Sequence, residues 1–129
     1  MIINVKNLTK SFDTGAQSVH ALKGINFSIN KGEFISIMGP SGSGKTTLMN
    51  IIGCLDSPTT GSYELNGKIV SELEEDMLAN IRNQEIGFVF QSFHLLPKNS
   101  ALNNVLLPLK YAGVKEGEAT KRAKEVLDK

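Results

Sequence analysis

The segment from Gly39 to Thr46 contains the residues of this chain that are best suited to chemistry. It reads Gly-Pro-Ser-Gly-Ser-Gly-Lys-Thr and fits the pattern G-x-x-x-x-G-K-[ST]. The apolar run Phe34–Met38 precedes it, and a stretch with helical character, residues 47–52, follows it. A strand, a glycine-rich loop and a helix in this order predict a backbone that wraps around phosphate groups.

The chemistry of this loop depends on main-chain N–H groups and on two side chains. Glycine allows the positive φ angles that turn successive N–H groups toward an anion, and the positive end of the following helix adds to the attraction. We expect Lys45 to reach the β- and γ-phosphates and the Thr46 hydroxyl to bind Mg²⁺. The alternative is an ordinary glycine-rich turn before a lysine. The predicted phosphate-binding residues are Gly39, Ser41, Gly42, Ser43, Gly44, Lys45, Thr46 and Thr47.

Composition limits the classes of protein to which such a loop can belong. The chain has 129 residues, enough for about one small domain. Its 14 basic and 13 acidic residues give a net charge of +1, so no broad basic face for nucleic acid is expected. The single cysteine, Cys54, fits a reducing compartment and is expected to be a buried hydrophobe rather than a reactive thiol. No apolar run approaches the roughly 20 residues that span a bilayer, so the chain taken alone is predicted to be soluble and cytoplasmic.

Hydrophobic patterns predict the elements that position the loop. Residues 2–8 and 19–29 are expected to form a small, mostly antiparallel sheet that leads into a strand at 34–38. A short strand at 62–65, a tight turn at Asn66-Gly67 and a helix over 74–83 are expected after the first helix. The apolar run 86–90 predicts a strand that is buried on both faces of a parallel sheet.

Two further helices are predicted toward the end of the chain. Pro97 and Pro108 bracket a helix around residues 102–107, and residues 116–129 have the pattern of a charged amphipathic helix. The chain stops inside this last helix without a capping glycine, so we expect it to be a fragment of a longer domain.

Motifs outside the loop resemble the nucleotide-binding domain of ATP-binding cassette (ABC) transporters. Lys10-Ser11-Phe12, residues 21–25 and residues 31–34 resemble the opening of that family, and residues 52–61 and 87–91 resemble its branch for lipoprotein release and macrolide-type export. The resemblance implies an α/β fold, that of a P-loop NTPase. It has a mostly antiparallel β subdomain, a P-loop strand and helix, and the start of a helical subdomain. The ATP-binding core would occupy residues 1–91, and the Q-loop and helical start residues 92–129.

The resemblance also implies roles for two residues outside the loop. Phe12 stands where the family places an aromatic side chain that stacks on adenine, although the pattern alone favours a core side chain of the first strand. Gln91 stands at the Q-loop position, where the amide oxygen meets Mg²⁺ or the attacking water. Lys45 and Gln91 are then the expected catalytic residues, and Thr46 and Gln91 the expected metal ligands. Without the family pattern, Gln91 reads as a solvated strand end.

The cofactors implied by the resemblance are ATP and Mg²⁺, and the implied partners are a transmembrane permease and a second nucleotide-binding domain. Phe93, Leu95 and Leu96 lie in the region that resembles the permease-docking segment, and packing inside the helical subdomain explains them equally well. The implied location is cytoplasmic, peripheral at the inner face of the cell membrane.

The family pattern also requires elements that this sequence does not contain. They are a signature loop L-S-G-G-Q, a Walker B strand that ends in Asp-Glu, and a switch histidine. We therefore expect these residues to bind nucleotide without hydrolysing it, and the complete protein to hydrolyse ATP and drive export or extraction of a substrate. The alternatives are a soluble ABC-type ATPase of DNA repair or translation, and a binding module without catalysis.

The missing elements also bear on stability. In the resembled fold, later strands lie between the strands at 34–38 and 86–90, so both would have unpaired edges in this chain. We expect the chain alone to be marginally stable, or to pair these edges with another copy.

Overall fold

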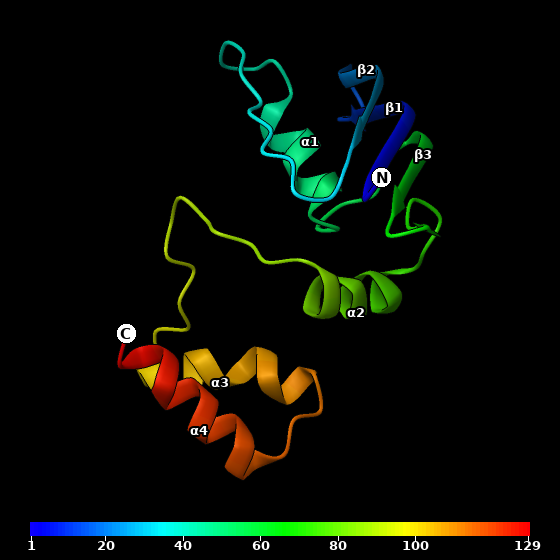
Figure 1. Ribbon diagram of the computed structural model, residues 1–129. Coiled ribbons are helices and arrows are strands. Elements are labelled where there is room, and N and C mark those ends of the chain that lie inside the picture. Colours follow the sequence, from blue (N-terminus) through cyan, green and yellow to red (C-terminus); the bar gives the residue numbers. More distant parts are fainter. The chain divides into compact units, whose positions relative to one another are not determined.

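The computed structural model describes residues 1–129, which divide into two compact units (Figure 1). The first unit, Met1–Arg82, is built around an antiparallel sheet. Its four strands are β1 (Ile3–Asp13), β2 (Ser18–Ile29), β3 (Thr60–Leu65) and β4 (Lys68–Ile69), in the order β2-β1-β3-β4. Each neighbouring pair is antiparallel. The predicted antiparallel sheet is therefore confirmed, and β1 continues beyond its predicted end to Asp13.

A bulge in β1 allows two apolar residues at an odd spacing to be buried together. Val5 and Leu8 are 2% and 0% exposed, although strict alternation would place them on opposite faces of the sheet. The register shifts between these two residues, and Asn7, which lies between them, has a φ of 48°. The Asn7 N–H donates to Asn26 Oδ1 at 2.8 Å, so the unpaired backbone group of the bulge is satisfied.

Helix α1 (Lys45–Ile52) and most of helix α2 (Glu75–Glu85) belong to the first unit. Helix α1 buries Leu48 and Ile51, and helix α2 buries Leu78 and Ile81. The hydroxyl of Tyr63, on β3, donates to the Ile52 carbonyl at the end of α1 at 2.8 Å, which ties the sheet to that helix. Both helices were predicted from sequence, and both are confirmed.

The second unit, Asn83–Lys129, contains helices α3 (Ala101–Tyr111) and α4 (Glu116–Leu127). Leu106, Ala119 and Ala123 form its core. The Ser100 hydroxyl caps α3 by accepting from the Asn103 N–H at 3.1 Å. The prediction that Pro108 follows this helix is wrong, because α3 runs through Pro108 to Tyr111. A proline inside a helix removes one intrahelical hydrogen bond. Helix α3 nevertheless continues past Pro108, and Leu109, in this last part of the helix, packs against the core.

The strands predicted at 34–38 and 86–90 are not formed in this chain. Both segments have no regular secondary structure, and Figure 1 draws them as plain coil. Phe34 is 93% exposed and Val89 is 97% exposed. A strand needs neighbouring strands to satisfy its N–H and C=O groups, and β1 to β4 pair only with one another. The apolar patterns alone therefore do not produce strands here.

Candidate phosphate-binding site

The glycine-rich loop is pressed against β2 at its last glycine. Gly44 precedes α1 as its N-cap residue and has a φ of 89°. A Cβ atom at this position would lie 2.5 Å from the Ala21 carbonyl oxygen and 3.1 Å from Leu22 Cδ2. Only glycine combines this backbone conformation with this close approach. The sequence therefore fixes the point at which the loop turns into the helix.

The N-terminus of α1, which follows the loop directly, is not capped by a side chain. The helix also has no acidic residue in its first turn. Its first intrahelical bond runs from the Leu48 N–H to the Gly44 carbonyl at 2.9 Å, so the N–H groups of Lys45, Thr46 and Thr47 have no acceptor inside the helix. An uncapped helix start with these N–H groups and the positive end of the helix dipole attracts anions.

The Lys45 ammonium group lies across the loop. Its Nζ donates to the Gly39 carbonyl at 2.7 Å, to the Pro40 carbonyl at 2.6 Å and to Ser43 Oγ at 3.2 Å. None of these acceptors carries a charge, so the positive charge of Lys45 is not neutralised by them. An anion in the loop would offer this ammonium group a stronger, charge-assisted hydrogen bond.

The other predicted loop residues surround this lysine. Ser41, Gly42 and Thr46 are exposed, and Thr47 is half-buried. At Gly39, a Cβ atom would lie 2.7 Å from Ser43 Oγ, so the two ends of the loop approach each other closely. The structure thus brings all the predicted phosphate-binding residues together in the first unit.

Phe12 and Gln91, the two predicted site residues outside the loop, lie in different units. Phe12 is near the end of β1 and is 43% exposed, which excludes the alternative of a core side chain. Gln91 is exposed, belongs to the second unit and lies in no helix or strand. The roles assigned to both residues remain predictions.

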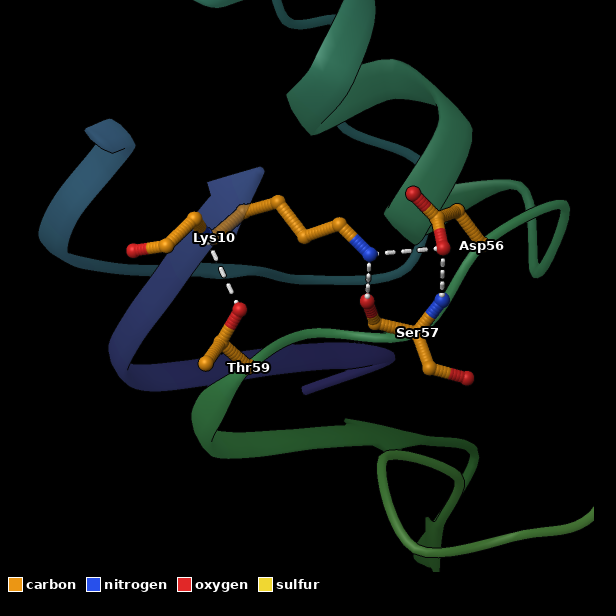
Figure 2. A network of polar contacts seen from close by, with 5 residues as sticks. Lys10, Asp56, Ser57 and Thr59 are labelled. Carbon is orange, nitrogen blue, oxygen red and sulfur yellow. Dashed lines mark hydrogen bonds and ion pairs between the residues drawn. The ribbon is translucent and has the colours of Figure 1, made fainter. Parts of the chain in front are cut away.

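A polar network next to Phe12 could not be predicted from the sequence. Figure 2 shows the Lys10 side chain reaching from β1 to Asp56 and Ser57, which follow α1 in the sequence. Lys10 Nζ donates to Asp56 Oδ1 at 2.8 Å and to the Ser57 carbonyl at 2.7 Å. Both partners belong to stretches that contain family-like motifs, but nothing in their spacing shows that they meet.

The structure also describes the single cysteine and the two histidines of the chain. Cys54 is 1% exposed, as predicted, and burial raises the pKa of its thiol. His20 is exposed, and its Nδ1 is hydrogen-bonded to Ser11 Oγ at 2.8 Å. His94 stacks on Phe90 with ring centroids 4.5 Å apart. The chain has no group of three or more His, Cys, Asp or Glu side chains placed to hold a metal ion, and none of its helices combines the length and apolarity needed to cross a membrane.

Comparison with known proteins establishes the family. The sequence profile described as ABC transporter matches residues 22–129. The chain belongs to the ABC transporter family. This ABC chain is 52% identical over 99% of its length to the uncharacterized ABC transporter ATP-binding protein YvrO of Bacillus subtilis strain 168, and it covers 56% of that protein. It is 50% identical over 99% of its length to the macrolide export ATP-binding/permease protein MacB of Mannheimia succiniciproducens, of which it covers 20%.

The fold of the ABC chain is also that of solved cassettes. The structure matches a dimeric post-hydrolysis state of the ATP-binding cassette MJ0796 bound to ADP and Pi with a TM-score of 0.89 and 47% identity. This match covers 98% of the ABC chain and 56% of the cassette. The predicted fold class is therefore confirmed, and the ABC chain spans about half the length of the first relatives it matches.

Proposed function

We propose that this chain is the ATP-binding part of an ABC transporter that couples ATP binding and hydrolysis to export or extraction of a substrate. The observation that carries the proposal is the segment from Gly39 to Thr46, which combines a close approach to β2, an uncapped helix start and a lysine without a charged partner. These are the groups that a triphosphate requires: backbone donors, a positive dipole end and one cation. The names of the relatives agree with this function.

In the proposed complex, Lys45 exchanges its loop acceptors for oxygens of the β- and γ-phosphates. The ammonium group then offsets charge on the transferring phosphoryl group, and the N–H groups from Ser41 to Thr46 act in the same way. Thr46, whose side chain is exposed beside the loop, would hold Mg²⁺, with Gln91 as a further ligand. A bound Mg²⁺ would neutralise part of the negative charge of the phosphates. The adenine base would stack on the exposed ring of Phe12.

We propose that residues 1–129 are the N-terminal portion of a longer ATPase domain, with the ATP-binding core in 1–91 and the Q-loop and helical start in 92–129. The coverage of 56% of each of two relatives supports the proposal that the domain is longer than these residues. The exposed apolar segments 34–38 and 86–90 also support it, because strands from the rest of such a domain would pair with them. The signature loop, the Walker B carboxylates and the switch histidine would come from that remaining part, so these residues alone bind nucleotide without hydrolysing it.

The proposed partners are a membrane permease and a second nucleotide-binding domain. Phe93, Leu95 and Leu96 are 91%, 65% and 44% exposed, so they offer apolar surface to a partner. The relatives include proteins named as combined ATP-binding and permease proteins, and the similar cassette MJ0796 is described as dimeric. We place the chain at the cytoplasmic, inner face of the cell membrane.

Replacing Lys45 by alanine in the full-length gene product tests the proposed function. ATP hydrolysis should fall by about two to three orders of magnitude, because one preorganised charge at the transferring phosphate is lost. Lys31→Ala, which changes an exposed lysine in the turn before the loop, serves as the matched control and should leave the rate unchanged. Near-normal hydrolysis by the Lys45→Ala variant would refute the assignment. ATP binding and hydrolysis measured on residues 1–129 alone separate a binding part from a complete enzyme.

A further inference from the structure

The Lys10 side chain is held more firmly than a typical surface lysine. It lies on β1 with only 14% of its side chain exposed, and its Nζ has two acceptors, Asp56 Oδ1 and the Ser57 carbonyl (Figure 2). The same carboxylate oxygen of Asp56 accepts the Ser57 N–H at 2.7 Å. The position of the ammonium group is therefore fixed by a carboxylate and a carbonyl that are themselves connected.

This ammonium group also lies over the ring of Phe12, with 5.2 Å between Nζ and the ring centroid. Lys10 and Phe12 lie two positions apart on β1, a spacing that places side chains on the same face of a regular strand. A cation over an aromatic face is attracted by the electron density of the ring. Phe12 is 43% exposed, so part of the ring remains accessible to another planar group.

The other end of the network is tied to the helix that follows the phosphate-binding loop. The Leu55 N–H, next to Asp56, donates to the Asn50 carbonyl of α1 at 2.8 Å. On β1, the Ser11 N–H donates to Thr59 Oγ1 at 2.9 Å, and the Thr59 N–H donates to the Thr9 carbonyl at 2.8 Å. The end of β1 is thus joined to the segment after α1 through both backbone and side-chain contacts.

We infer that Lys10 is a positioning residue for the base of the bound nucleotide. It holds the Phe12 ring at a fixed place relative to α1, whose N-terminus borders the phosphate site. This inference rests on the proposed function, in which the triphosphate lies at residues 39–47 and the base on Phe12. A ring that is already oriented loses less side-chain freedom when the base stacks on it, so the affinity for the base is higher.

A purely structural role for Lys10 makes a different prediction. If the ion pair only stabilised the first unit, its loss would weaken every ligand of the loop to the same extent, with or without a base. If Lys10 orients Phe12, its loss weakens only those ligands that carry a base.

The test compares ATP with ribose 5-triphosphate, which has the same phosphates and sugar but no base, on the full-length gene product. Their dissociation constants are measured by competition against a fluorescent ATP analogue. Lys10→Met, which keeps an unbranched side chain and removes the charge, should weaken ATP about 3- to 10-fold and change ribose 5-triphosphate less than about 2-fold. Lys6→Met changes an exposed lysine of the same strand and should alter neither constant.

Two further variants complete the design. Lys10→Arg keeps a cation and should retain most of the ATP affinity. Phe12→Ala should weaken ATP, and adding Lys10→Met to it should have no further effect, because the ring that Lys10 orients is absent. If Lys10→Met does not fold, Asp56→Asn replaces it, since this change removes the charge that fixes the ammonium group.

The outcomes separate the two proposals. Equal weakening of both ligands, an unchanged ATP constant, or additive effects of the two substitutions would overturn the role of Lys10 while leaving the nucleotide site intact. Absence of binding of both ligands to the unmodified protein would instead refute the proposed function itself.

Discussion

The antiparallel sheet and the two apolar segments at 34–38 and 86–90 contain similar residues but differ in structure. Val5, Leu8 and Tyr63, on β1 and β3, are at most 2% exposed. Phe34 and Val89 are more than 90% exposed, and their segments have no strand. The difference is that every long strand of the sheet has an antiparallel neighbour within the chain, while the apolar segments have none. Apolar character therefore predicts what a segment would bury, and pairing decides whether it becomes a strand.

The difference also bears on the glycine-rich loop, which an unpaired segment precedes. The unpaired residues 34–38 precede the loop, whereas Gly44, at the other end of the loop, packs against β2. The loop is therefore supported by the sheet mainly at its C-terminal end. Four predictions follow, in order of decreasing effect at neutral pH; the first two compare the paired and the unpaired regions directly, and the last two test a contact of the sheet.

The largest effect is expected from truncating a core side chain of the sheet. Leu8→Ala should lower the free energy of unfolding of residues 1–129 by about 3 kcal/mol, because Leu8 is completely buried and its loss leaves a cavity. Val89→Ala removes a side chain that is 97% exposed and should cost less than about 0.5 kcal/mol. Denaturant unfolding of both variants measures the difference. Similar losses for the two variants would show that the segment at 86–90 is packed in solution.

A smaller effect is expected from adding a methyl group to a glycine of each region. At Gly61, which has a φ of +90°, a new Cβ atom would lie 2.3 Å from the Asn7 carbonyl oxygen. Gly61→Ala should therefore cost about 2 kcal/mol, within the range for strained backbone conformations. Gly87 has no atom within 4 Å of such a Cβ, and Gly87→Ala should have little effect or stabilise slightly. A shift in thermal midpoint for Gly87→Ala as large as that for Gly61→Ala would contradict the unpaired state of its segment.

The smallest effect at neutral pH is expected at a tyrosine of the sheet. Tyr63→Phe should cost about 1 kcal/mol, because it removes the hydrogen bond to the Ile52 carbonyl. Tyr111→Phe, in an exposed position of α3, is the matched control and should cost almost nothing.

Tyr63→Phe, compared with the unmodified chain, also tests the pH dependence of stability. Burial raises the pKa of Tyr63 above its ordinary value of 10.0, so the folded state favours the neutral phenol. The corresponding stabilisation is complete below pH 10 and is lost as the pH rises above it. Between about pH 8 and about pH 10.5, the free energy of unfolding should therefore fall more steeply for the unmodified chain than for Tyr63→Phe. Parallel falls in the two proteins would show that Tyr63 ionises without cost.

Local patterns predicted much of the fold. The sheet of β1, β2 and β3, the helices α1 and α2, and α4 were found because alternation and helical spacing can be read within one segment. The loop from Gly39 to Thr46 was found because its glycines and lysine follow a fixed short pattern. The continuation of α3 through Pro108 was not predicted. A proline in the sequence indicates a helix end, and the sequence does not show that Leu109 packs against the core.

Contacts between distant residues could not be predicted in the same way. The ion pair of Lys10 with Asp56 joins residues that are 46 positions apart, and the exposure of Phe12 follows from its place near the end of β1. The sequence by itself determined the family, the glycine-rich loop and the strand character of β1, β2 and β3, since each can be read from motifs or alternation within one segment. Only the tertiary structure decided which apolar segments became strands and which side chains surround Phe12, because both depend on partners that lie far away in the sequence.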